Sequence, residues 1–534
     1  MTVRSRGGVV AYVITQNCCK DASCVPVCPV DCIRPVDASA ADMLYIDPES
    51  CIDCGACFDE CPVDAIYYEE DVPAAQARFR EINAEYFQRH PLEPDTTPQR
   101  PSRQVADGEL TVAIVGAGPA ACYAAAELMA IDGVRVNLFE RLPTPFGLIR
   151  AGVAPDHQHT KSVVDIFDRT FVNPRFGCHL GVEIGKDLSH DQVLDHHHAV
   201  IYAVGAATSR PLGIAGEDLP GSHPAADFVG WYNGHPDYAD GGFVLDGERA
   251  VIIGNGNVAL DIARMMLLDS AALGRTDIAD HALDALRDST IREVVVLGRR
   301  GIADAAFSVG EFLALGELDG VDVTIDGPVQ DSTGDTDLWA TLKLDIAREY
   351  AARPTTPGNR RIILRFNTSP VEIIGDGRVS GLRVERDGAN EVLDASLVLR
   401  SIGYRGVPVP GLPFDDVAGV VPNEDGRVQD SPGSYVAGWI KRGPRGVIGS
   451  NRTCAEQTVE TLWRDHCDGK LTRDIAGPES LSAALRENDA QPVDWSGWRN
   501  IDAAERRRGA AVDRPRVKFI GIPQLRSASV TAGS

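Results

Sequence analysis

The stretch LTVAIVGAGPAACYAAAELM, residues 110–129, decides the fold of most of this chain. An apolar run with the length of a buried strand leads into two closely spaced glycines, and an alanine-rich helix follows. Gly116 can make the tight turn, Gly118 lets a pyrophosphate approach the backbone, and Ala121 allows the helix to pack closely on the strand. The stretch therefore predicts an α/β fold with a phosphate-binding helix N-terminus.

The next strand, VRVNLFE, ends in Glu140, where a carboxylate can accept hydrogen bonds from ribose hydroxyls. A second copy of the pattern, RAVIIGNGNVALDIARMML, occupies residues 249–267 and carries Gly254, Gly256 and Ala259. Its following strand ends in Arg299 and Arg300 instead of an acid. A carboxylate there would repel a 2′-phosphate, whereas two guanidiniums can bind it, although ordinary surface arginines are the alternative. The first site thus suits FAD and the second NADP(H).

Length and composition limit the classes of protein to consider. At 534 residues the chain should form two to four domains, and 44% hydrophobic with 24% charged residues is typical of a globular protein. A formal net charge of −25 argues against nucleic acid as a partner. Because the sequence has no apolar run of membrane-spanning length and no signal peptide, we expect a cytoplasmic protein without a membrane partner.

Nine of the thirteen cysteines lie in the first 61 residues. A disulfide framework would suit a small secreted chain, so clustered thiols indicate metal ligands here. The segment CIDCGACFDECP places Cys51, Cys54 and Cys57 at intervals of three, followed by Cys61 and a proline. This spacing is typical of iron–sulfur clusters, and zinc is the weaker alternative because its sites usually use two separated pairs.

Residues 9–75 resemble the bacterial two-cluster ferredoxins, a small α+β fold. The crossed ligation of that family implies one 4Fe–4S cluster on Cys28, Cys51, Cys54 and Cys57. Three further ligands, Cys18, Cys24 and Cys61, remain for a second cluster.

Asp21 stands where the fourth ligand of the second cluster would be. A carboxylate holds soft iron less tightly than a thiolate does, which favours a 3Fe–4S cluster as in the seven-iron ferredoxins. An Asp21-ligated 4Fe–4S cluster is the alternative. Cys19 and Cys32 fit neither ligand set and are expected to be spare thiols, although Cys19 could replace Cys18.

Residues 73–90 have a helical pattern and predict a helix that closes the small domain. The proline-rich segment that comes next indicates a spacer and a domain boundary near residues 91–108. Residues 1–75 hold thirteen acidic and four basic residues. This charge suits either a solvated face or a carrier that docks on a basic reductase surface.

Residues 110 to about 465 resemble the adrenodoxin-reductase type of ferredoxin–NADP reductase. The carrying segments are long: PFGLIRAGVAPDHQHTK (145–161), FVGWYNG (228–234), GNGNVALD (254–261), GRRGIADAAF (298–307) and GWIKRGPRGVIGSN (438–451). The resemblance implies two nested Rossmann-like domains of the glutathione-reductase class, preceded by the ferredoxin-like domain. It also implies hydride transfer from NADPH to FAD, then single-electron transfer to the clusters and on to an acceptor protein.

Site residues carried over from this resemblance fall into three sets. FAD contacts are implied for Ala120, Glu140, Leu148, Val182, Trp439, Gly446, Val447 and Ile448. NADP contacts are implied for Asn255, Gly256, Asn257, Val258, Arg299, Arg300, Glu311 and Gly446. His157 and Asp261 match polar positions near the flavin, where His157 could move a proton or merely order its loop.

The expected domains are a two-cluster ferredoxin (1–75), a helix and linker (76–108), the first part of an FAD-binding domain (109–206), an NADP-binding domain (207–402), the second FAD part (403–480) and an extension packed on the FAD domain (481–534). Other interpretations stay open: an electron-carrier subunit of a larger complex, and a glutamate-synthase-like small subunit, which lacks the GVAPDH and GWIKRGPRGVI combination. The final acceptor, which could be a separate ferredoxin, and the oligomeric state are not set by the sequence.

Overall fold

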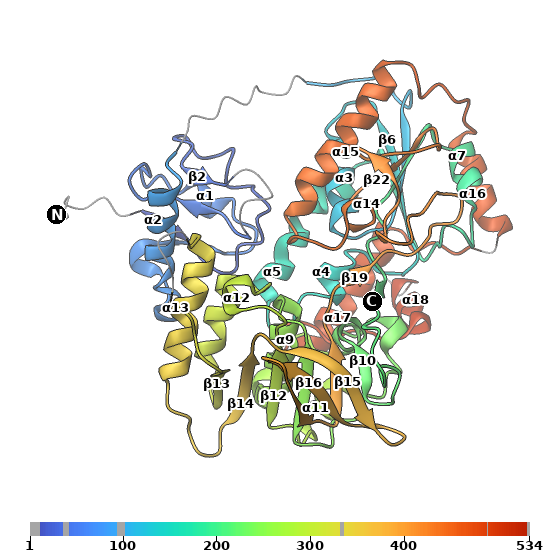
Figure 1. Ribbon diagram of the computed structural model, residues 1–534. Helices are drawn as coiled ribbons and strands as arrows, with labels where there is room; N and C mark the ends of the chain where they lie inside the picture. Colours follow the sequence, from blue (N-terminus) through green and yellow to red (C-terminus); the bar gives the residue numbers. More distant parts are fainter. Residues whose placement is uncertain (1–10, 36–41, 93–101, 332–335, 489, 531–534) are drawn as a thin grey trace.

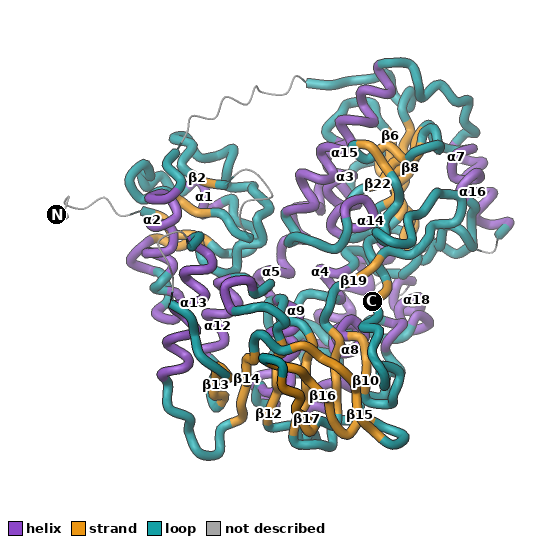
Figure 2. Tube along the Cα trace, viewed as in Figure 1, coloured by secondary structure: helices purple, strands orange, loops and turns teal. Residues whose placement is uncertain are grey.

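A computed structural model describes residues 11–35, 42–92, 102–331, 336–488 and 490–530 (Figure 1). Strands gather mainly in two places, and helices and loops surround them (Figure 2). The α/β expectation is confirmed, and the mixed architecture is built around two largely parallel sheets. No helix among the described residues is long and apolar enough to cross a membrane.

The first sheet has seven strands and forms on the glycine-turn stretch. Five of them are parallel neighbours, and β20 and β21 extend the sheet in antiparallel fashion. Alanine-rich α3 (Pro119–Met129) packs against α15 (Ser450–Cys467), so residues more than 300 positions apart cover the same sheet. The strand order is β20 (Asn423–Glu424), β21 (Arg427–Val428), β22 (Ser434–Val436), β8 (Ala199–Tyr202), β5 (Thr111–Val115), β6 (Arg135–Glu140) and β7 (Phe176–Leu180).

The second sheet has six parallel strands, all from residues 222–400. In the sequence this segment comes after β8 and before β20, so it is inserted between two strands of the first sheet. Helices α8 (Ala225–Tyr232) and α9 (Asn257–Leu267) pack on it. The strand order is β10 (Ser222–Pro224), β18 (Leu397–Arg400), β11 (Arg249–Ile253), β12 (Glu293–Leu297), β14 (Arg360–Arg365) and β13 (Val321–Asp326). An antiparallel sheet of β15 (Ser369–Gly375), β16 (Val379–Arg386) and β17 (Ala389–Asp394) lies beside it.

The N-terminal unit, residues 11–35 and 42–92, is held together by one buried side chain. Asn83 lies on α2 (Phe79–Arg89), and its amide oxygen accepts the backbone N–H groups of Ile14 and Ile46 at 3.3 and 2.9 Å. Its amide nitrogen donates back to the Ile14 carbonyl at 2.9 Å. A single side chain thus joins the helix to β1 (Tyr12–Ile14) and β3 (Tyr45–Ile46).

The helix predicted over 73–90 is shorter in the structure. Residues 74–76 form a separate 3₁₀ turn after Pro73, and α2 begins only at Phe79. The remaining short elements of the unit are β2 (Ile33–Arg34), which pairs with β3, β4 (Ile66–Tyr68), which pairs with β1, and α1 (Ala56–Asp59). Residues 93–101 of the proline-rich spacer lie outside the described residues.

The N-terminal unit packs beside the second sheet (Figure 1), against α12 (Val309–Ala314) and α13 (Leu338–Ala352). Tyr45 stacks on Trp339 with ring centroids 5.4 Å apart, and Arg78 pairs with Glu349 at 2.8 Å. Gly310 leaves room for Gln16, because a Cβ there would lie 3.2 Å from the Gln16 Cβ.

The C-terminal segment contains α16 (Pro478–Glu487), α17 (Trp495–Ala510) and α18 (Ile522–Val530). Trp495 stacks on Phe171 of α6 (Asp168–Phe171), which precedes β7 of the first sheet, with ring centroids 4.4 Å apart. Arg514 donates to the Thr276 carbonyl at 2.9 Å, so the segment also contacts residues beside the second sheet.

A buried ion cluster joins three distant parts of the chain. Asp277, 2% exposed at its side chain, pairs with Lys161 at 2.7 Å and Lys518 at 3.0 Å. Burial alone would raise the pKa of Asp277, but the two ammonium groups hold it below its usual range. The contribution to stability is therefore present at neutral pH and is lost only as the pH falls below the ordinary aspartate range.

We expect Asp277→Asn to lower the free energy of unfolding by about 3–5 kcal/mol, because it leaves two buried ammonium groups without a counter-charge. Urea denaturation followed by circular dichroism measures the change. Asp284→Asn is the control: its pair with Arg287 is exposed and should contribute at most about 1 kcal/mol. Equal shifts for both variants would contradict the assigned role of Asp277.

Candidate functional site

The two glycines of the first turn differ in their surroundings. Gly116 has φ +104°, and a Cβ there would lie 2.6 Å from the Ala203 carbonyl oxygen, so the fold itself requires glycine. Gly118, at the N-terminus of α3, has ordinary φ and no atom within 4 Å of a Cβ. Ala120 and Ala121 are buried behind it. The open space at Gly118 fits the approach of a pyrophosphate.

Glu140 is oriented by the backbone of the same turn. Its carboxylate accepts the Ala117 N–H at 2.9 Å and the Leu142 N–H at 3.0 Å. Desolvation raises the pKa of Glu140, and these two bonds pull it down. The carboxylate is thereby fixed beside the glycine turn, with remaining lone pairs to accept from a ligand hydroxyl.

Other residues proposed for FAD lie around this turn. A Cβ on Gly147 would lie 3.0 Å from the Gly118 Cα, which places Leu148, the first residue of α4 (Leu148–Ala151), next to it. The Val182 N–H donates to the Glu140 carbonyl at 2.8 Å, but its buried side chain leaves only backbone for a ligand. Trp439 begins α14 (Trp439–Arg442), and Gly446, Val447 and Ile448 lead into α15.

The second turn repeats this geometry. A Cβ on Gly254 would lie 2.0 Å from the Ser401 carbonyl oxygen, whereas Gly256 again faces open space. Asn257 accepts the Ser308 N–H at 2.7 Å, and Asn255 accepts that of Ala306 at 3.5 Å. These amides tie the turn to the loop before α12. Val258 is the partly buried second residue of α9.

Arg299 and Arg300 are exposed directly after β12, beyond the carboxyl end of the strand. Arg300 has only a long contact of 3.8 Å to Asp304. In parallel α/β sheets ligands bind at this end of the strands. Both guanidiniums can therefore reach an anionic group bound at the second turn.

His157, just before α5 (Gln158–Lys161), converges with Asp261 of α9 and Glu311 of α12, and one ligand-type atom of each lies within 4.8 Å of the others. Desolvation raises the pKa of Glu311, against the pull of His157. The guanidinium of Arg264 binds both Asp261 and Asp156. This positive charge offsets the two carboxylates and makes the group less favourable for a metal cation.

Sequence reasoning assigned Glu311 to NADP and did not select Arg264 or Asp156. A signal for Arg264 existed, because it lies three residues after Asp261 on a helix and so shares its face. The His196–His198 run gives no joint site: His197 bonds to the Val193 carbonyl, and His198 accepts the Thr111 N–H.

The cysteines form two groups. The proximal group consists of Cys18, Cys24 and Cys61. Burial is the main cause that raises the pKa of the Cys24 thiol, and the nearby Cys18, Asp21 and Cys61 raise it further. The distal group consists of Cys28, Cys51, Cys54 and Cys57. Burial first, and then the three other cysteines of the group, raise the pKa of the Cys57 thiol to about 12. Cys51 differs, because a hydrogen bond from Cys32 lowers its pKa to about 6. Buried thiols such as Cys24 and Cys57 ionise poorly alone, and metal binding to thiols requires that they lose their protons.

Asp21 lies beside the proximal group, and Cys32 lies beside the distal group. Asp21 is buried, and its carboxylate accepts the Ser23 N–H at 3.0 Å and the Ser23 hydroxyl. Cys32, expected to fit neither ligand set, lines the distal group, with its Sγ 3.5 Å from the Cys28 Sγ. Cys19 is buried on the side of the first sheet.

The proximal group faces the first sheet. The Gly449 N–H donates to the Cys19 carbonyl at 2.9 Å, and Arg452 donates to the Asp21 carbonyl at 2.7 Å. A Cβ on Gly449 would lie 1.7 Å from the Lys20 carbonyl oxygen, so only glycine permits this approach.

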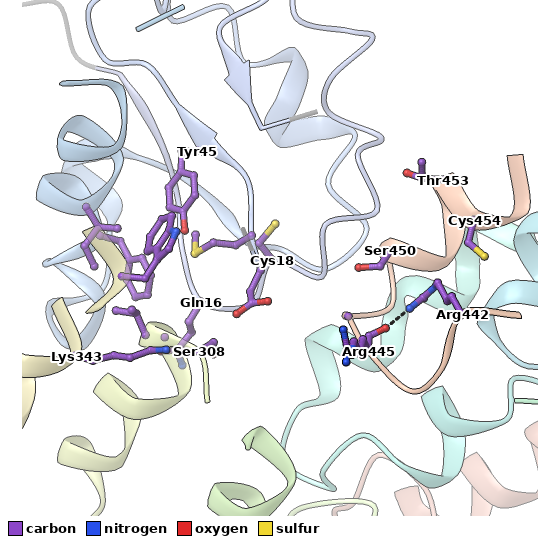
Figure 3. Close-up of a pocket in the computed structure, with 18 of the residues that line it drawn as sticks. Gln16, Cys18, Tyr45, Ser308, Lys343, Arg442, Arg445, Ser450, Thr453 and Cys454 are labelled. Atoms are coloured by element: carbon purple, nitrogen blue, oxygen red, sulfur yellow. Dashed lines mark hydrogen bonds between the residues drawn. The ribbon is translucent and has the colours of Figure 1, made fainter. Parts of the chain in front are cut away.

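Beside this contact a cleft of about 950 Å³ opens (Figure 3). Cys18 of the N-terminal unit lies on one wall, and Arg442 of α14 and Ser450 of α15 lie on the other. Ser308 and Lys343, next to α12 and on α13, line its base. The cleft thus borders the N-terminal unit and both sheets.

Comparisons with known proteins match each part. Residues 44–67 match the 4Fe-4S binding domain family, and residues 110–301 match the pyridine nucleotide-disulphide oxidoreductase family. The chain is 48% identical over 549 residues to a probable ferredoxin/ferredoxin–NADP reductase of Mycobacterium tuberculosis, covering 98% of this chain and 95% of that protein.

A shorter relative covers the reductase part alone. The NADPH-ferredoxin reductase FprA of M. tuberculosis is 46% identical over 451 residues, covering 78% of this chain and 98% of that protein. The solved structure of M. tuberculosis FprA in complex with NADPH superposes with a TM-score of 0.76 at 43% identity, covering 79% of this chain and 100% of that one.

We expect Gly118→Ala to leave the stability of the apoprotein unchanged and to weaken FAD binding on the order of tenfold, because its Cβ enters space meant for pyrophosphate. Thermal unfolding of apoprotein and FAD titration measure the two effects. The control is Gly477→Ala, which is also a helix N-terminus with ordinary φ and open space. Unchanged FAD affinity in Gly118→Ala would contradict the assignment.

Proposed function

The chain belongs to the fused ferredoxin/ferredoxin–NADP reductase family, and on that premise we propose which residues hold its cofactors and how electrons pass along it. The protein is an FAD-dependent oxidoreductase that carries out NADPH-driven electron transfer with a ferredoxin domain in the same chain. When bound, FAD accepts the hydride of NADPH and gives up the electrons singly, and iron–sulfur clusters carry one electron at a time.

In this proposal the seven-stranded sheet is the FAD-binding domain, formed by residues 109–206 and 403–480, and the six-stranded sheet is the NADP-binding domain inserted between them. Residues 1–75 form the ferredoxin domain. The open space at Gly118 and the backbone-oriented carboxylate of Glu140 support the FAD site. Gly147, just before Leu148, lies against Gly118, and Gly438, just before Trp439, lies against Ala120. Residues 446–448 lead into α15, which packs on α3, and Val182 offers its backbone.

The second turn and the arginines after β12 hold NADP(H). Gly256 faces open space where a pyrophosphate would lie, and Asn255, Asn257 and Val258 form the helix start beside it. Arg299 and Arg300 bind the 2′-phosphate through charge-assisted hydrogen bonds. This phosphate distinguishes NADPH from NADH.

His157, Asp261 and Glu311 handle protons and orientation. Arg264 fixes Asp261 by an ion pair, which orients the carboxylate without a metal. Glu311 lies within 4.8 Å of His157, and burial raises its pKa, so the two side chains are placed to exchange a proton. With FAD and NADP(H) bound, His157 would move a proton near the flavin.

The distal group Cys28, Cys51, Cys54 and Cys57 holds a 4Fe–4S cluster, and the proximal group Cys18, Cys24 and Cys61 holds a 3Fe–4S cluster. The observation that supports the three-iron form is the state of Asp21. Both hydrogen bonds from Ser23 fall on Oδ2 of its carboxylate and hold that oxygen toward Ser23. A hard oxygen donor held in this way retains soft iron poorly.

We expect Arg299→Ala and Arg300→Ala to raise the KM for NADPH by about 10–100-fold each, since charge-assisted hydrogen bonds are worth roughly 1.5–3 kcal/mol. Steady-state kinetics with ferricyanide as acceptor measure this, and the KM for NADH should change less than about twofold. Arg292→Ala, at the opposite end of β12, is the control. Equal effects on both nucleotides would show that the guanidiniums do not read the phosphate.

We expect the wild-type protein, purified without oxygen, to hold seven irons per chain and to show a three-iron EPR signal in its oxidised state. Asp21→Cys should hold eight irons and lose this signal, because a fourth thiolate retains the missing iron. Asp21→Ala, the control, should keep the signal. Eight irons in the wild-type protein without a three-iron signal would contradict the three-iron assignment. Bleaching of the flavin by NADPH tests the reductase activity separately.

A further inference from the structure

The two cysteine groups have opposite surroundings. The proximal group lies against the reductase part, through the Gly449–Cys19 hydrogen bond and the bond from Arg452 to the Asp21 carbonyl. The Ser162 hydroxyl also donates to the Pro62 carbonyl at 2.7 Å, directly after Cys61. Backbone and side-chain contacts therefore join this group to the segments next to the FAD site.

The distal group faces outward instead. Cys54 is exposed. Around it lie three exposed apolar side chains, Val30, Ile52 and Phe58, which are 37%, 56% and 52% exposed. We call these three residues the exit patch. Val30 and Ile52 line the same small cavity as the distal cysteines, so the patch and the sulfur atoms belong to one surface.

Charge around the exit patch has one sign. Asp53, Asp59 and Glu60 are exposed beside it in the chain, and Glu49 is exposed just before Cys51. In residues 11–35 and 42–72 the basic residues are Lys20, which is buried, and Arg34, which pairs with Asp31. We call the four exposed acids around the patch the acidic rim: Glu49, Asp53, Asp59 and Glu60. No exposed positive charge from residues 11–35 and 42–72 offsets it.

We propose that electrons enter the ferredoxin domain at the proximal group and leave it at the distal group, through the exit patch, to an acceptor protein whose redox centre has a basic rim. This inference rests on the proposed cluster ligands. One NADPH reduces two acceptor molecules by one electron each, giving NADP⁺ and one proton, so the electrons balance. Apolar contact at Ile52 and Phe58 excludes water between the centres, and the acidic rim steers the acceptor.

The competing surface is the cleft near the first sheet, which carries Lys343, Lys441, Arg442 and Arg445. Its charge is positive, so it repels a basic acceptor and suits an acidic one. The cysteine of the two groups that lines this cleft is Cys18, from the proximal group. An acceptor that bound there would bypass the distal cysteines, which makes the two surfaces distinguishable by mutation.

The test uses oxidised holoprotein and a basic monohaem cytochrome c as probe, with binding followed by NMR shifts in the absence of NADPH. Ile52→Lys and Phe58→Lys should each weaken binding about tenfold at low salt, because they remove apolar contact and add a repelling charge. Val417→Lys is the control, since Val417 is 96% exposed and belongs to the FAD part. Its binding should change less than about twofold.

Raising the salt concentration should weaken wild-type binding strongly, as expected for acid–base steering. Equal weakening by Val417→Lys and the two patch variants overturns the proposal, as does a wild-type protein that fails to bind the cytochrome at low salt. Cluster EPR signals and flavin bleaching by NADPH should be the same in all variants. Loss of those signals in the wild-type protein would count against the proposed function itself, not against the location of the exit patch.

Discussion

The approach of the ferredoxin loop to Gly449 is the constraint on which electron transfer within this chain depends. The backbone of residues 18–21 reaches the start of α15 so closely that any side chain at position 449 would collide with the Lys20 carbonyl. The same position comes directly after residues 446–448, which we propose as part of the FAD site. One missing Cβ thus brings the proximal cysteines next to this segment, and the stacking of Tyr45 on Trp339 holds the unit from its other side.

The two copies of the glycine turn differ in the residues that end the strand after each turn, and on this difference we base the proposal that they bind different groups. In both copies the first glycine is required by a backbone carbonyl of the neighbouring strand, and the second faces open space. Selectivity comes later in each repeat. Glu140, fixed by two amides, offers acceptors to hydroxyl groups, whereas the exposed Arg299 and Arg300 offer donors to a phosphate.

Much of this arrangement could be predicted from the sequence, because it depends on local patterns. The glycine turns, the residues after each strand and the spacing of the cysteines all report short-range geometry, and the family assignment is confirmed by full-length relatives. The ligand sets and catalytic roles stay predictions. Contacts between distant segments could not be read in this way: Gly449 meets Cys19 across 430 positions, and Arg452 donates to the Asp21 carbonyl across 431. Arg264 was missed although Asp261 lies three residues before it on the same helix, because its second partner, Asp156, comes from a segment 108 positions earlier.

The burial of Glu505 has a consequence for how the protein is made. Its carboxylate is fully buried and pairs with Arg150 at 2.6 Å, far earlier in the chain. Because a ribosome releases the chain in order, Arg150 waits without this partner until α17 has been synthesised. Phe146 and Phe171, beside the seven-stranded sheet, likewise meet Trp495 and Trp498 only when α17 has been made, and until then they are apolar surface on which chaperones can act.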